Sequence, residues 1–240
     1  MTISVHSLVR LLSWIIAAFI VLGWTTQFYA SIYVPEQFQN TGSHGLIRMF
    51  YLGGESNVPT WYHSMLLLSC SFLLSLACRS TSEQPFCFHW RAMAIIFLLL
   101  SLDEVACFHE GLSNRLSQQF HTTGFFRYVW VVPGAFFAFG FFLWSLRFLR
   151  HLTASTRNRF IIAGAVYVAG AVGWEMISGW CDDHYGLQSL IPMTVNVVEE
   201  SLESIGALLF IRALLLHLKG MQRSEHGDIG ARRLELVIQD

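Results

Sequence analysis

The chain has 240 residues, of which 54% are apolar, 15% aromatic and only 13% charged. An ordinary soluble domain carries about a quarter charged residues, so this composition excludes that class. A mean hydropathy of +0.48 and several separate apolar runs indicate instead a polytopic membrane protein. The five cysteines show no CxxC spacing, which argues against a zinc ribbon or a disulfide framework.

The apolar runs predict an all-α bundle of six transmembrane helices. In chain order we expect the spans over about 8–30, 61–78, 90–111, 128–148, 160–180 and 193–218. The first run lacks a convincing cleavage site, so it is interpreted as a retained span and not a signal peptide. The loop over 34–60 is long enough to hold an interfacial or re-entrant piece. The transmembrane domain is expected to cover 1–219, and a charged cytoplasmic tail is expected over 220–240.

The distribution of Lys and Arg predicts the orientation. With the N-terminus inside, the outer segments hold only Arg48, Arg115 and Arg127. The inner segments collect the remaining flanking basic residues, namely Arg10, Arg79, Arg91, Arg147, Arg150, Arg157, Arg159, Lys219, Arg223, Arg232 and Arg233. This asymmetry satisfies the positive-inside rule and predicts an inner (plasma) membrane protein with both termini in the cytoplasm.

Ionisable residues interrupt the apolar spans at one depth. The third span ends in Ser101–Glu110, which places Asp103, Glu104, His109 and Glu110 within eight residues. The fifth span carries Glu175, the sixth carries Glu199, Glu200 and Glu203, and the second carries His63. Counted along each helix, these residues stand roughly 18–30 Å from the inner basic residues, in the outward half of the bilayer. Because carboxylates in a span normally face a partner, a cavity or an ion, we expect one shared polar site.

Helical periodicity predicts which of these side chains face the site. Asp103, Cys107 and Glu110 share one face, whereas Glu104 and His109 point away from it unless the helix is locally broken. The sixth span presents Asn196, Glu200 and Glu203 together. Gly164, Gly170 and Gly173 of the fifth span predict close helix packing.

Carboxylates with a few histidines on facing helices are typical of di-iron or di-manganese bundles, although the Glu-x-x-His pattern of soluble examples is absent. Oxygen ligands favour Fe or Mn, and Zn is also compatible. The predicted metal ligands are His63, Asp103, Glu110, Glu175, Glu200 and Glu203, and the predicted proton-transfer residues are Glu104, His109 and Glu199. No cofactor beyond the metal is predicted.

Three alternatives to this metal site stay open. The carboxylates can form a proton or cation pathway, they can be structural or interfacial, or His63 and His109 can ligate a haem. The sequence contains no HExxH, no G-x-S-x-G and no phosphate-binding loop, and it gives no sign of nucleic-acid binding.

The combined prediction is a membrane-embedded metalloenzyme, oxidative or hydrolytic, that acts on a lipid or another apolar substrate. The alternative is a small proton- or cation-coupled transporter, or an accessory subunit of a larger membrane complex. Membrane lipids are the expected partners, beside a possible homo-oligomer or a partner in a membrane complex.

Overall fold

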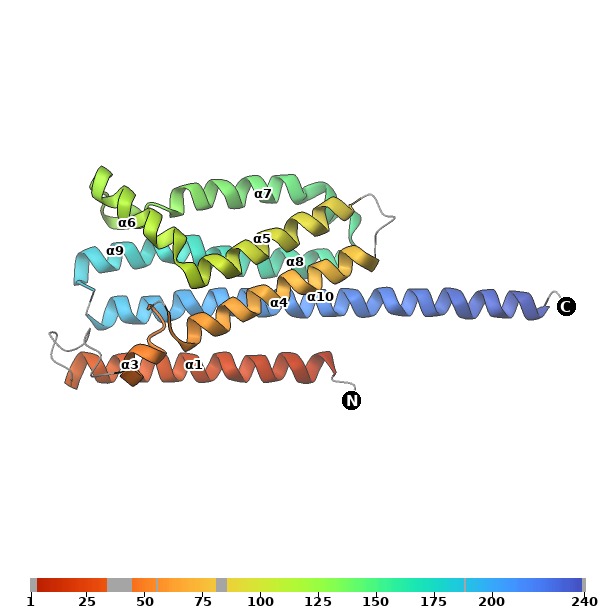
Figure 1. Ribbon diagram of the computed structural model, residues 1–240, viewed down its shortest axis with the longest axis horizontal. Coiled ribbons are helices and arrows are strands. Elements are labelled where there is room, and N and C mark those ends of the chain that lie inside the picture. Colours follow the sequence, from red (N-terminus) through yellow and green to blue (C-terminus); the bar gives the residue numbers. More distant parts are fainter. Residues whose placement is uncertain (1–3, 34–44, 55, 81–85, 188, 239–240) are drawn as a thin grey trace.

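A computed structural model describes residues 4–33, 45–54, 56–80, 86–187 and 189–238, and within these ranges all regular structure is helical. Figure 1 shows the elements in order. They are α1 (Val5–Tyr33), α3 (Gly45–Phe50), α4 (Val58–Ser80), α5 (Cys87–Ala106), α6 (Phe108–Phe120), η2 (Gly124–Phe126), α7 (Val131–His151), α8 (Ala154–Val168), η3 (Ala169–Trp174), α9 (Glu175–Tyr185) and α10 (Leu190–Ile238).

Five helical segments of the described chain are long and apolar enough to cross a membrane, and the number rises to six if the bent pair α5–α6 is one span. The segments α8, η3 and α9 run on without interruption from Ala154 to Tyr185 and together make one of the five. Large apolar side chains such as Trp14, Phe72 and Phe136 are exposed on the outside, which suits contact with lipid. The all-helical part of the sequence prediction is therefore confirmed, and the described chain has five to six helical segments apolar enough to span a membrane.

The third predicted span, 90–111, is wrong as a single straight helix. The chain bends by 68° between α5 and α6, because Cys107 adopts a left-handed conformation with φ of 54°. Oδ1 of Asp103 accepts a hydrogen bond from the backbone N–H of His109 at 3.1 Å and so stabilises the start of α6. A carboxylate placed at a new helix N-terminus also interacts favourably with the helix dipole.

The structure adds detail to two further segments. The backbone of α10 stays helical to Ile238, so the tail predicted over 220–240 continues the last helix as far as that residue. The predicted loop over 34–60 contains the short helix α3, and α4 already begins at Val58. Residues 34–44 and 55 of that loop lie outside the described residues.

The hydrophobic core lies where α4 packs between α5 and α10. Leu67, Cys70, Leu74 and Ala77 of α4 are fully buried there, together with Leu214 of α10. Helix α1 begins and helix α10 ends toward the same end of the bundle (Figure 1). The opposite end holds α3, α6 and the junction between α9 and α10.

Glycine allows α8 and α10 to approach each other closely. A Cβ on Gly206 would stand 2.6 Å from the backbone nitrogen of Tyr167, and one on Gly170 would stand 2.9 Å from Cγ of Glu203. Close packing is therefore confirmed for Gly170. It is wrong for Gly164 and Gly173, since nothing lies within 4 Å of a Cβ added at either position.

Replacement of Gly206 by Ala should lower the free energy of unfolding by about 1–3 kcal/mol, because the added methyl group meets backbone that cannot move aside. Gly164→Ala is the matched control and should be neutral or stabilising, since its methyl group enters open space in a helix. Thermal unfolding in detergent followed by circular dichroism measures both. Equal stabilities of the two variants would contradict the close α8–α10 contact.

Candidate functional site

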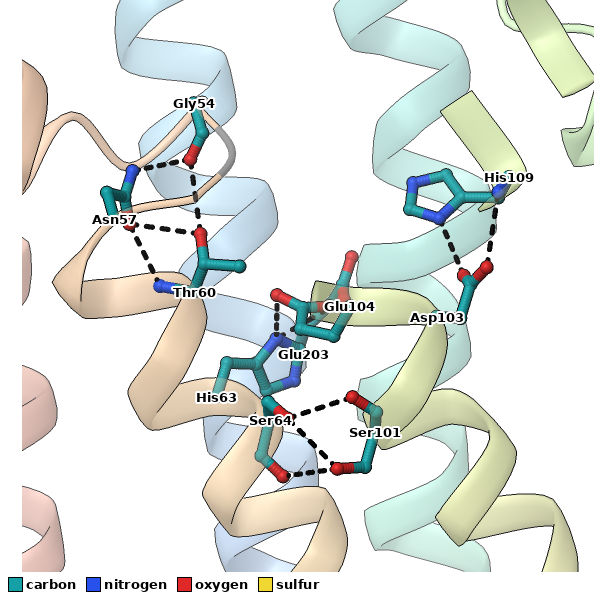
Figure 2. Close-up of polar contacts among 10 residues, drawn as sticks. All are labelled: Gly54, Asn57, Thr60, His63, Ser64, Ser101, Asp103, Glu104, His109 and Glu203. Atoms are coloured by element: carbon teal, nitrogen blue, oxygen red, sulfur yellow. Dashed lines mark hydrogen bonds and ion pairs between the residues drawn. The ribbon is translucent and has the colours of Figure 1, made fainter. Parts of the chain in front are cut away.

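Three helices bring one histidine and several glutamates together in the bundle. The side chain of His63 on α4 is 1% exposed, and its Nδ1 lies 3.1 Å from Oε1 of Glu104 on α5. The same nitrogen lies 4.0 Å from Oε2 of Glu203 on α10, as Figure 2 shows. Glu200 joins this cluster, since one ligand atom from each of His63, Glu104 and Glu200 lies within 4.8 Å of the others. Nε2 of His63 is buried and has no hydrogen-bond partner among the described residues.

A pair of serines fixes α4 against α5 directly beside this cluster. The hydroxyl of Ser64 donates to the carbonyl oxygen of Ser101 at 2.8 Å, and the hydroxyl of Ser101 donates to the carbonyl oxygen of Ser64 at 2.9 Å. The two hydroxyl oxygens lie 2.9 Å apart. Ser64 follows His63 in the chain and Ser101 precedes Glu104 by three residues. The reciprocal bonds therefore set the distance between those two side chains (Figure 2).

The loop before α4 holds the end of that helix nearest to His63. Oδ1 of Asn57 accepts a hydrogen bond from the backbone N–H of Thr60 at 3.0 Å, as expected of a helix N-cap. The hydroxyl of Thr60 donates to the carbonyl oxygen of Gly54 at 3.1 Å, which ties the loop back onto α4. A Cβ on Gly53 in the same loop would lie 2.8 Å from Nδ2 of Asn196, so the loop also approaches α10.

Asp103 and His109 form a second group, which spans the bend between α5 and α6. Oδ2 of Asp103 lies 2.6 Å from Nδ1 of His109, and the ring of His109 lies 5.0 Å from that of Trp130. Figure 2 shows that Asp103 points toward His109 and away from His63. The bend at Cys107 makes this pairing possible, because His109 no longer follows the helical rotation of α5.

A third acidic group lies between α9 and α10. Glu175 begins α9 directly after η3, a π-helical turn over Ala169–Trp174. The hydroxyl of Ser178 donates a hydrogen bond to Oε2 of Glu199. Indole Nε1 of Trp174 donates to the carbonyl oxygen of Val195 at 3.0 Å and holds the two helices together. Single π-helical turns inside α-helices are frequent at functional sites.

One cavity of about 840 Å³ touches all three groups. Its polar end is lined by Asp103, Glu104, His109, Glu110, Glu175, Glu199, Glu200 and Glu203. Eight of the nine residues singled out in the sequence therefore face one space, and the ninth, His63, contacts Glu104. Gly53 also lines the cavity, so the loop before α4 contributes to its wall. The volume falls in the range of small-molecule binding sites.

The arrangement departs from helical periodicity in one respect. The face shared by Asp103 and Glu110 was expected to supply ligands, and Glu104 was expected to act in proton transfer. Glu104 is the residue that reaches His63, whereas Asp103 binds His109. Sequence reasoning also missed Tyr128 and Trp130 as cavity-lining residues, because aromatic residues near the end of a span are equally typical of a membrane boundary.

Two half-buried tyrosines lie outside the spans at this end of the bundle. Burial raises the pKa of Tyr128, and its hydroxyl donates to Oδ2 of Asp182 at 2.6 Å. Burial, with a smaller effect from the Asp182 carboxylate, also raises the pKa of Tyr51. Both phenols therefore stay protonated at neutral pH. Arg127 pairs with Asp183 beside them, which anchors the segment before α7 onto α9.

The serine pair predicts a measurable coupling. Ser64→Ala and Ser101→Ala should each lower the free energy of unfolding. The double variant should lose less free energy than the sum of the two single losses, and this difference should be about 0.6 kcal/mol and at most about 1.7 kcal/mol. Unfolding in detergent measures all three variants.

Ser71→Ala provides the control, because the Ser71 hydroxyl bonds elsewhere, to the carbonyl oxygen of Ala94 at 2.7 Å. Its effect should add to that of Ser64→Ala within about 0.5 kcal/mol. Strict additivity of Ser64→Ala and Ser101→Ala would contradict the 2.9 Å contact between the two hydroxyl groups, which is the part of the pair that needs both side chains.

Comparison with known proteins gives a family for this architecture. No curated protein and no solved structure matches the chain. The model of a domain of unknown function, DUF8692, matches residues 12–218, and this region contains all nine of the singled-out residues. Since the match covers most of the 240 residues, the chain belongs to the DUF8692 family.

Proposed function

We propose that the protein is a membrane-embedded, metal-dependent enzyme that acts on a lipid or another apolar substrate. The observation that carries the proposal is the convergence of His63, Glu104 and Glu200, from three helices, on one point, where His63 is buried and the two glutamates are partly buried. Carboxylate and imidazole ligands suit Fe or Mn, and Zn is also compatible. The proposed setting is the inner (plasma) membrane, with both termini in the cytoplasm and the site in the outer half of the bilayer.

The spacing of the ligand atoms suits a single ion. Two ligands at about 2.1 Å from one ion stand about 3.0 Å apart when adjacent and about 4.2 Å apart when opposite. The 3.1 Å between Nδ1 of His63 and Oε1 of Glu104 equals an adjacent pair. The three ligand atoms all lie within 4.8 Å of one another, so no spacing among them exceeds that of an opposite pair by more than about 0.6 Å. Glu203, at 4.0 Å from His63, would be the fourth protein ligand.

Electrostatics also favour a cation at this point. His63 and the side chains of Glu104 and Glu203 are nearly or largely buried, and none of the described residues lining the cavity is Lys or Arg. Carboxylates that are close together in a low-dielectric environment cannot all ionise unless protons or a metal compensate their charge. A bound divalent ion would supply this compensation and would activate water or polarise a substrate oxygen.

The remaining groups have roles around the ion. Asp103 holds His109 through Nδ1, which leaves Nε2 of that ring as a proton donor or acceptor at the cavity wall. Glu199 is held by the Ser178 hydroxyl and is the second proton-transfer candidate. Glu110 and Glu175 complete the acidic wall. From this wall they can hydrogen-bond to groups around the ion, and such bonds orient ligands and tune a metal.

Elemental analysis of the purified protein tests the proposal. The wild type should contain Fe, Mn or Zn in stoichiometric amount, and His63→Gln, Glu104→Gln and Glu200→Gln should each reduce this content at least tenfold. Asp182→Asn is the matched control and should keep the metal, since Asp182 is a buried carboxyl that binds Tyr128 and does not line the cavity.

A wild type without metal after growth with each of these ions would contradict the enzyme proposal. In that case, pH-dependent cation flux into liposomes that is abolished by Glu104→Gln would establish the transporter. Absence of both metal and flux, with assembly into a larger complex that requires the acidic residues, would establish an accessory subunit.

A further inference from the structure

The cavity continues well beyond the acidic cluster as an apolar channel. Its inner part is lined by Ile96, Phe97 and Leu100 of α5, Ala138 and Phe141 of α7, and Phe210 of α10. On α5 the lining runs from Glu104 back to Met93, a distance of about 16 Å along the helix. This is about half the thickness of a bilayer's hydrocarbon region. The shape therefore suits an elongated apolar chain more than a compact ring.

The channel lies between α5 and α7, where the two helices are spaced apart. Aromatic ring contacts close it at each end. At the inner end the ring of His89 stacks on that of Trp144 at 4.1 Å, and Trp90 packs on Phe148 at 4.9 Å. At the outer end the His109 ring contacts Trp130. Between these contacts one face of each helix lines the cavity, with Phe97 and Leu100 on α5 and Ala138 and Phe141 on α7.

Small residues keep the channel open on the opposite wall. Ala163, Gly164, Ala165 and Ala171 of the α8–η3 segment line the cavity, and a Cβ on Gly164 would meet nothing within 4 Å. A larger side chain at Gly164 would therefore occupy the channel without a clash against the helices that carry the acidic cluster.

The polar end sets the charge of the head group that the channel can accept. Seven carboxyl groups line it, with one histidine and neither Lys nor Arg among the described lining residues. A divalent ion bound by a neutral His63 would offset two of these charges, so an anionic head group would meet the remaining carboxyl groups with no Lys or Arg among the described lining residues to pair with. A phosphate or carboxylate head group is thus disfavoured, whereas an amine or a hydroxyl can donate hydrogen bonds to the carboxylates.

We propose that the cavity binds a single-chain amphiphile with a cationic or uncharged head, with a long-chain amine as its clearest example. The chain lies along the apolar channel between α5 and α7, and the head lies among Glu104, Glu199, Glu200 and Glu203. This inference rests on the proposed function for what then happens at the head, but binding itself does not require the metal.

Photo-crosslinking tests the inference on the full chain in detergent. The probes are an alkylamine that carries a diazirine in its chain and the alkyl carboxylate of the same length with the same diazirine. The amine should label residues such as Phe97, Phe141 and Phe210 at least tenfold more than the carboxylate. Gly164→Leu should reduce this labelling at least fivefold, and an amine with a shorter chain should restore part of it.

Gly140→Leu is the matched control, because a Cβ there also meets nothing within 4 Å but Gly140 does not line the cavity. Its labelling should equal that of the wild type. Equal labelling by both probes would overturn the head-group assignment, and labelling unchanged by Gly164→Leu would overturn the channel. Metal analysis of the same samples separates the two proposals, since labelling without metal would support this inference while contradicting the enzyme.

Discussion

The energy of a carboxylate in hydrocarbon governs the design of this protein. A charged side chain at the centre of a bilayer costs about 2.5–3.5 kcal/mol on insertion scales and more by other estimates, so each one must find a partner or an aqueous space. The chain has seven such groups around one cavity, drawn from α5, α6, α9 and α10. Close contacts between helices bring these carboxyl groups together. The serine pair joins α4 to α5, and Gly170 and Gly206 allow α10 to pack against the α8–η3 segment. The exterior is left to large apolar side chains.

Departures from regular helix concentrate around this assembly. Cys107 breaks α5 from α6, and the π-helical turn η3 precedes Glu175. A continuous α-helix would present Glu104 and His109 on faces that point apart, because successive residues turn by about 100°. The break releases His109 to bind Asp103 and leaves Glu104 facing His63. Non-glycine residues in the left-handed conformation are uncommon and cluster at functional sites, so this bend is itself an indication of function.

The sequence was sufficient for the class of fold and for the membership of the acidic cluster, but it could not assign individual roles. Depth follows from counting residues along each apolar run, and this count predicted Glu175, Glu203 and His63 at one level. The direction in which a side chain points is harder to predict than its depth, since one irregular residue redirects every side chain beyond it. The left-handed residue at 107 is a cysteine, which carries none of the usual signal for such a position. Glycines posed a similar difficulty. Gly206 lies at a close helix contact, whereas a Cβ at Gly164 would enter open space, although both residues lie in apolar helices.

The unequal packing of the helices gives the molecule a soft side and a stiff side. Gly170 and Gly206 bring α10 against the α8–η3 segment so closely that an added Cβ would clash, whereas α7 borders the cavity along its middle. Hydrostatic pressure favours states with smaller internal voids. Compression of this protein should therefore be anisotropic, with α7 moving inward while the spacing between α8 and α10 hardly changes.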